Sequence, residues 1–267
     1  MIGVIISTSS TELRFLRPQL RECLKFSKHV YLTIASHRFD GIHEEPIDEF
    51  QQIAAEFPEV TIIRYQVLPP DGFDNPLKVR PGAYWHNISR IVGTKYLIMK
   101  DAMDECRWLM YLDGDEIPDG TGMAAWRDST LRLQDGQSGM YLANYWYFRE
   151  PVYRAKSLEA SVPVVPRSIF TDEDSVVGIL MHDWERCSFQ GVLHMHQYVV
   201  PQTSVPLIHH FSWVRSKEDI LRKVATWGHS QDKPWAQLIE DTWDKPFDGR
   251  DFVHGYEYDV VDNAFGV

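Results

Sequence analysis

From residue 2 to residue 113, short apolar runs alternate with segments whose apolar residues recur at helical spacing. The apolar runs at residues 2–7, 30–35, 60–67 and 108–112 predict four strands. Helical spacing predicts helices over residues 10–24, 47–57 and 82–92, with a further helical stretch to residue 103. Strand and helix in this rhythm predict an α/β fold, with a mainly parallel central sheet flanked by helices.

The second half of the chain has a different pattern. Strands are predicted at residues 139–148, 162–170, 191–196 and 206–211, and helices near residues 121–133, 217–228 and 235–243. There is no linker, repeat or low-complexity tract between the halves. We therefore expect one domain over residues 1–267, in which a mixed α+β extension (about 121–267) packs on the sheet of the first half (about 1–120).

Charge and cysteine content restrict the classes of partner and compartment. A formal net charge of −11 argues against nucleic acid or an anionic membrane as partner. Cys23, Cys106 and Cys187 are too far apart for a metal-ligand motif or a disulfide framework, which favours a reducing compartment. The sequence shows no charged leader and no long apolar segment. It predicts a soluble, cytoplasmic protein without a signal peptide or a transmembrane segment.

An acidic cluster follows the fourth predicted strand directly. The apolar run ends at Asp113, and Gly114, Asp115 and Glu116 come next. Carboxylates this close repel one another unless a cation or hydrogen-bond donors neutralise them. Asp113 and Asp115 point the same way if strand geometry persists, so both could reach one Mg²⁺ or Mn²⁺ that also binds a diphosphate. The alternative is an acidic turn after an edge strand. A calcium loop is excluded, because the twelfth position is Ala124.

Three short segments resemble glycosyltransferases of the GT-A fold. Residues 113–118, Asp-Gly-Asp-Glu-Ile-Pro, are similar to the signature of the family-17 N-acetylglucosaminyltransferases and related bacterial and viral enzymes. Residues 210–213, His-Phe-Ser-Trp, and the helix predicted after them resemble the Trp-His-x-Ser segment of those proteins. Residues 177–184 resemble the Gly…Glu-Asp-Trp segment of family-2 inverting enzymes, with His182 in place of the glutamate.

The resemblance implies a metal-dependent glycosyltransferase that moves a sugar from a UDP- or GDP-sugar to a hydroxyl of a glycan or glycoconjugate, with inversion. It implies that Asp113 contacts the ribose or the metal, that Asp115 ligates Mn²⁺ or Mg²⁺, and that Asp183 is the catalytic base. Asp172, Glu173, Asp174 and Glu150 are the rival bases.

Other site residues follow from their positions. His210 is predicted as a third metal ligand from the other side of the cleft. Strand ends, the helix before the acidic cluster and the helix after His210 supply predicted nucleotide-sugar contacts. With Asp113 and Gly114 these are Ser7, Thr8, Ser36, Arg80, Asn87, Arg90 and Lys223.

Two other functions remain open. A nucleotidyltransferase that makes sugar nucleotides shares this type of sheet, but it normally has a glycine-rich phosphate loop after its first strand, and residues 7–11 contain no glycine. A non-catalytic carbohydrate-binding module would account for the 9 Trp and 12 Tyr. It leaves the clustered carboxylates and His210 without a role.

Overall fold

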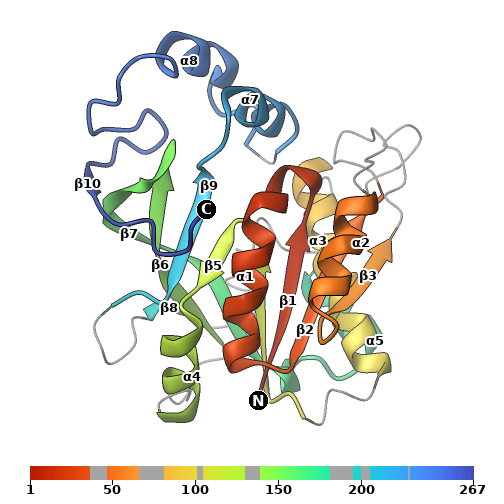
Figure 1. Ribbon diagram of the computed structural model, residues 1–267. Helices are drawn as coiled ribbons and strands as arrows, with labels where there is room; N and C mark the ends of the chain where they lie inside the picture. The colour runs from red at the N-terminus through yellow and green to blue at the C-terminus, as the bar shows by residue number, and fades with distance from the viewer. Residues whose placement is uncertain are drawn as a thin grey trace.

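The structure is a computed structural model that describes residues 1–36, 47–65, 81–100, 105–129, 139–180, 195–199, 205–227 and 229–267 (Figure 1). Within these residues one sheet has the strand order β3-β2-β1-β4-β7-β6-β9-β5, with β10 beside β7 and β8 beside β6. The strands are β1 (Ile2–Thr8), β2 (His29–Ala35), β3 (Thr61–Tyr65), β4 (Trp108–Asp113), β5 (Glu116–Pro118), β6 (Gly139–Phe148), β7 (Glu150–Pro166), β8 (Met195–Val199), β9 (Ile208–Trp213) and β10 (Tyr258–Val260).

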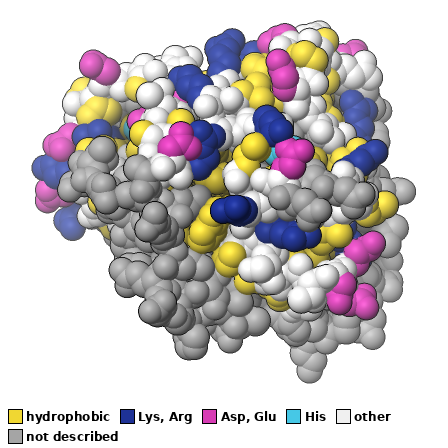
Figure 2. All heavy atoms as spheres, turned by 90° about the horizontal axis from the view of Figure 1, so that it is seen from below, with side chains coloured by type: hydrophobic (Ala, Val, Ile, Leu, Met, Phe, Trp, Pro, Cys, Tyr) yellow, Lys and Arg dark blue, Asp and Glu magenta, His cyan; other side chains and the backbone are white. Residues whose placement is uncertain are grey.

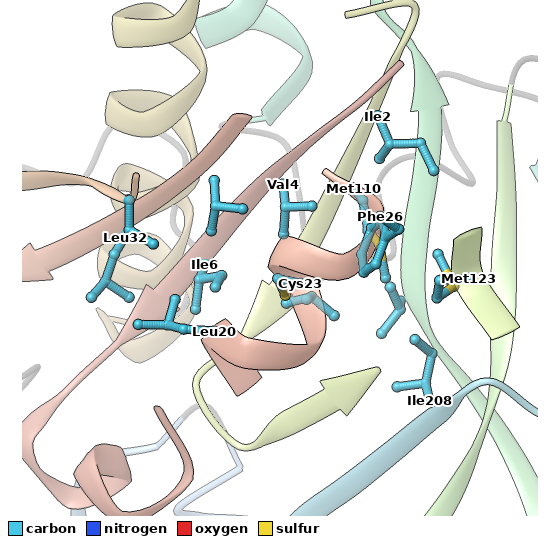
Figure 3. Packing of buried hydrophobic residues seen from close by; sticks show 14 of the residues in the cluster. Ile2, Val4, Ile6, Leu20, Cys23, Phe26, Leu32, Met110, Met123 and Ile208 are labelled. Atoms are coloured by element: carbon cyan, nitrogen blue, oxygen red, sulfur yellow. The ribbon is translucent and has the colours of Figure 1, made fainter. Parts of the chain in front are cut away.

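Helices cover both faces of this sheet. They are α1 (Leu13–Phe26), α2 (Ile47–Glu56), α3 (Pro81–Met99), α4 (Gly120–Ser129), α5 (Glu173–Leu180), α7 (Lys217–Thr226) and α8 (Trp235–Thr242), with 3₁₀ turns at Ser10–Glu12 and Arg167–Ile169. Side chains alternate across β1, so Ile2, Val4 and Ile6 join the core under α1, α2 and α4, whereas Ile5 joins the core under α3 and α5. Figure 3 shows the first core, which residues of β1, β2, β4, β9, α1 and α4 build together.

The strand directions predict the place of a ligand-binding crevice. β3, β2, β1 and β4 are all parallel, whereas β7 pairs antiparallel with β4 and with β6. From β1 the chain proceeds outward through β2 and β3 and then returns to the other side of β1 as β4, so the strand order reverses between β1 and β4. Open α/β sheets bind ligands at the carboxyl ends of the strands at such a point. The predicted α/β class, with a mixed second half on the same sheet, is confirmed.

Several element boundaries differ from the prediction. The strand predicted at 162–170 is the end of the much longer β7, which forms a hairpin with β6 through Arg149 at φ 60°. β5, within the acidic run, and β10 were not predicted. β5 is an edge strand, where the missing N–H of Pro118 costs no sheet hydrogen bond. One helix, α3, spans the region predicted as two stretches, and its last predicted residues (101–103) lie outside the described residues.

The end of the molecule opposite to the carboxyl ends of β1 and β4 carries the amino ends of the parallel strands. There basic, acidic and apolar side chains are interspersed among the described residues (Figure 2). None of the described helices combines the length and the apolar character needed to cross a bilayer.

Candidate functional site

The acidic cluster forms a tight turn between β4 and β5. The Gln19 side chain of α1 donates to the backbone carbonyls of Asp113 (2.7 Å) and Glu116 (2.6 Å), one at each end of the turn. The Glu116 side chain stabilises the turn. Its Oε2 accepts a hydrogen bond from the backbone N–H of Asp113 at 2.9 Å, and its Oε1 accepts one from the Ser161 hydroxyl at 2.8 Å. The glutamate thus shapes the turn that carries the two aspartates.

Gly114 lets this turn approach the start of α1. A Cβ built on Gly114 would lie 2.6 Å from both Thr8 Oγ1 and Glu12 Oε2. Glu12 is itself fixed, since its Oε2 accepts from the backbone N–H of Ser9 at 3.0 Å. The glycine of the motif is therefore required by packing between the turn and the end of β1.

We expect Gly114→Ala to lower the free energy of unfolding by about 1–3 kcal/mol, the usual cost of an overpacked contact. The added methyl must displace Thr8 or Glu12. Urea denaturation measures this loss of stability. Gly178→Ala is the control, because its Cβ meets nothing within 4 Å on α5 and should stabilise the helix slightly. Equal stability of Gly114→Ala and the wild type would contradict this packing.

Asp115 lies in a buried cluster of charges. Its side chain is 2% exposed, and its Oδ2 accepts from Arg215 Nη2 at 2.6 Å and from Lys223 Nζ at 3.0 Å. Lys223 comes from α7 and also donates to the Ser212 hydroxyl at 2.7 Å. Arg215 also donates hydrogen bonds to the Thr11 carbonyl and, from Nη2 at 3.5 Å, to Glu12 Oε1. This cluster connects the turn, α1 and the segment after β9.

The cluster shifts the protonation of its members. Burial alone would raise the pKa of Asp115, but Lys223, His210 and Arg215 together hold that pKa well below its usual range. Burial lowers the pKa of Lys223, and Asp115 opposes the shift. Burial and then the charge of Asp115 raise the pKa of Glu12 to about 7. Asp115 is therefore ionised at neutral pH, whereas Glu12 gains or loses its proton near pH 7 and so changes the net charge of the cluster.

Asp113 has different partners. Its Oδ1 lies 2.9 Å from His86 Nε2 and 3.4 Å from Arg90 Nη2, both on α3. Arg90 is 1% exposed and also donates to the Asn87 side chain at 3.3 Å. The structure thus brings the predicted residues Asn87, Arg90 and Asp113 together. His86 was missed, although it is four residues before Arg90 and therefore on the same face of the helix.

The geometry around Asp115 and His210 suits a divalent cation. Asp115 Oδ1 lies 3.4 Å from His210 Nε2, while Arg215 and Lys223 bind the other oxygen of the carboxylate. Adjacent donors of an octahedral ion with bonds of about 2.1 Å are about 3 Å apart, so the two atoms could share one ion. Within the described residues no three His, Cys, Asp or Glu side chains converge as ligands. Phosphates and water would complete such a site.

The other predicted nucleotide contacts lie at the crevice or outside the described residues. Ser7, whose Cα is paired with that of Asp113 across β1 and β4, has a buried hydroxyl without a hydrogen-bond partner among the described residues. Thr8 follows it at the strand end, and Ser36 follows the end of β2. Arg80 and Asp183, the predicted base, lie outside the described residues. A buried hydroxyl without a described partner calls for an explanation, and its place beside Asp113 puts it next to the acidic turn.

The three rival bases of the α5 region lie away from the acidic turn. Glu173 pairs with Lys95 at 3.2 Å, and Lys95 lies more than one helical turn beyond Arg90 along α3, away from Asp113. Asp172 and Asp174 flank Glu173 at the start of α5, in the lower part of Figure 1, whereas β1, which is parallel to β4, ends toward the upper part. Glu150 is exposed at the start of β7. This placement separates all three acidic residues of the α5 region from the crevice.

Comparisons with known proteins find similarity only in structure. No protein-family model and no curated protein sequence matches the chain. One similar solved structure is 4-diphosphocytidyl-2C-methyl-D-erythritol synthase, with 11% identity over 83% of this chain and 98% of that chain and a TM-score of 0.42. A second is the mannosyltransferase PcManGT from Pyrobaculum calidifontis in complex with GDP-Man and Mn²⁺, with 8% identity over 84% of this chain and 59% of that chain and a TM-score of 0.43. A third is the glycosyltransferase GlyE of Streptococcus pneumoniae TIGR4, with 11% identity over 91% of this chain and 64% of that chain and a TM-score of 0.35. At these TM-scores the similarity assigns no function, which depends on the residues of the site.

Proposed function

We propose that the chain is a metal-dependent glycosyltransferase that transfers a sugar from a UDP- or GDP-sugar to a hydroxyl of a glycan or glycoconjugate. The observation that carries this proposal is the position of the Asp113-Gly114-Asp115 turn. It lies where the strand order of a parallel sheet reverses, beside the carboxyl ends of β1 and β4. This is the place at which such sheets bind nucleotides.

The two sides of the turn suggest separate tasks. On the α3 side, Asp113 with Arg90 and His86 would contact the ribose and the base, together with Ser7, Thr8 and Ser36 at the strand ends. On the other side, Asp115 and His210 would hold Mn²⁺ or Mg²⁺ through Oδ1 and Nε2. Such an ion stabilises the negative charge that develops on the leaving diphosphate. Lys223 and Arg215 fix the carboxylate and add positive charge behind it.

The stereochemical part of the proposal is direct displacement with inversion. A base must deprotonate the acceptor hydroxyl opposite the diphosphate. Asp183, the base that the sequence resemblance implies, lies outside the described residues. The configuration of the product, measured by NMR, tests this step. A retained anomeric configuration would contradict it.

We expect calorimetry to detect binding of UDP or GDP that depends on Mn²⁺. His210→Ala should weaken that binding at least about tenfold, because it removes one of two protein donors. The control is His209→Ala, since His209 points to the other face of β9, where its Nδ1 is 2.8 Å from the Tyr147 hydroxyl. Nucleotide affinity that is unchanged in a chelator would contradict the metal site, and a carbohydrate-binding module would ignore nucleotide altogether.

A screen of UDP- and GDP-sugars for hydrolysis identifies the donor. A nucleotidyltransferase would instead release pyrophosphate from a nucleoside triphosphate in the presence of a sugar phosphate. That outcome, without cleavage of any nucleotide sugar, would contradict the proposed reaction.

A further inference from the structure

The loop between α8 and β10 carries a histidine, His254, that the proposed site does not use. The loop wraps around the carboxylate of Asp251, which is 4% exposed. Its Oδ1 accepts from the backbone N–H of His254 (2.5 Å) and of Gly255 (3.1 Å), and its Oδ2 accepts from the N–H of Tyr256 (3.0 Å) and the hydroxyl of Tyr258 (2.9 Å). Four bonds to one buried carboxylate hold the His254 backbone in place.

The imidazole of His254 lies beside a glutamate. Its Nδ1 lies 3.6 Å from Glu159 Oε1, and the Tyr256 hydroxyl donates to the same oxygen at 3.2 Å. The ring also stacks on Tyr256, with the centroids 4.9 Å apart. The side chain is 33% exposed, and within the described part of the chain Nε2 makes no hydrogen bond. A partly exposed histidine whose Nδ1 faces a carboxylate, with Nε2 unpaired among the described residues, has the arrangement of a general base.

One indole separates this histidine from the proposed metal site. Trp146 makes edge contacts with both His210 (ring centroids 4.7 Å apart) and His254 (4.9 Å). The strand register places Glu116, His210 and Trp146 in one row across β5, β9 and β6. The C-terminal segment (blue in Figure 1) brings the His254 loop to the end of this row. His254 and Glu159 therefore lie beside the crevice, on the side away from α3.

We propose that His254, beside Glu159, accepts the proton of the attacking hydroxyl in place of Asp183, a role that rests on the glycosyl transfer proposed above. The hydroxyl oxygen forms a bond to the anomeric carbon of the donor while the bond from that carbon to the diphosphate oxygen breaks. The electron pair of the broken bond leaves with the nucleoside diphosphate, and the hydroxyl proton moves to His254 Nε2. Glu159 is a positioning residue, which holds Nδ1 and balances the charge of the imidazolium.

The charges around His254 suit this role. Burial lowers its pKa, and Glu159 and Asp251 oppose that shift, while Lys233 and His210 add to it. Lys233 reaches the loop through the carbonyls of Val253 (2.6 Å) and Phe252 (3.2 Å). The imidazole is accordingly neutral at pH 7 and able to accept a proton.

The test uses the nucleotide sugar that the wild type hydrolyses, with water as the acceptor. His254→Gln should lower kcat about 10²- to 10⁴-fold, the usual contribution of a general base, and leave the calorimetric affinity for UDP or GDP within about twofold. The control is His29→Gln, because His29 pairs with Glu105 at 3.1 Å at the amino end of β2 and should keep full activity. Glu159→Gln should lower kcat less and move the acid limb of the kcat–pH profile to lower pH, which a purely structural role would not do.

The outcomes separate two failures. If the wild type binds no nucleotide and cleaves no nucleotide sugar, the proposed function fails and this inference fails with it. If the wild type turns over and His254→Gln keeps kcat within about threefold, or loses nucleotide affinity as much as turnover, only the role of His254 is overturned. The role of His254 would also be overturned if the acid limb of the kcat–pH profile stayed in place in Glu159→Gln. A large loss of kcat in Asp183→Asn alone would assign the proton to Asp183.

Discussion

Asp115→Asn is expected to lower the free energy of unfolding by about 3–5 kcal/mol. The carboxylate is the shared partner of Arg215 at 2.6 Å and Lys223 at 3.0 Å, and the side chains of Asp115 and Arg215 are both buried. An amide leaves both cations without this counter-charge. Lys223 can lose its proton, but a guanidinium stays charged, so the cost of a buried unpaired charge remains.

Urea denaturation at pH 7 measures this effect. The control is Asp128→Asn, because Asp128 pairs with Arg127 at the surface with 66% of its side chain exposed, and it should cost no more than about 1 kcal/mol. Adding Lys223→Met to Asp115→Asn should recover part of the loss, since one unpaired cation is removed. If Asp115→Asn lowered the free energy of unfolding by less than about 1 kcal/mol, Asp115 would not be the counter-charge on which Arg215 and Lys223 depend. Activity of the variant must be judged against its stability.

The second large effect is a pH dependence that comes from Glu12. Its pKa rises from 4.5 to about 7 in the folded protein, through burial and the nearby Asp115. The stability that a raised pKa contributes is fully present below the unfolded pKa and is lost as pH rises through the folded one. Between pH 4.5 and pH 7 the free energy of unfolding should therefore fall by up to about 3 kcal/mol on account of this residue.

Glu12→Gln isolates this contribution, because glutamine resembles the protonated acid and can still accept from the Ser9 N–H. We expect the difference in unfolding free energy between wild type and variant to change across this window, with the wild type losing stability relative to the variant. Asp115 does not interfere, because its lowered pKa places its own loss of stability at more acidic pH. A difference that stays constant from pH 4.5 to pH 8 would contradict the shifted pKa.

Local pattern was sufficient for most of the elements. The alternation of apolar runs and helical periodicity predicted β1 to β4 and α1 to α3 near their observed bounds, because each buries a continuous stripe of apolar side chains. β5 and β10 were missed. Each is three residues long and is defined by its partner strand, β9 or β7, which no local pattern reveals. The extent of β7 depended in the same way on its hairpin with β6.

The sequence by itself determined the α/β class and the position of the acidic turn at the end of β4, because apolar periodicity and an abrupt change to carboxylates are local properties. Only the tertiary structure decided which groups meet those carboxylates. Arg215 and Lys223 lie about a hundred residues from Asp115 and reach it because β9 pairs with β5, whereas Asp113 turns to His86 and Arg90 on α3. Charge pairing acts through space, so its partners are fixed by strand order and register, and these emerge only when the whole sheet is assembled.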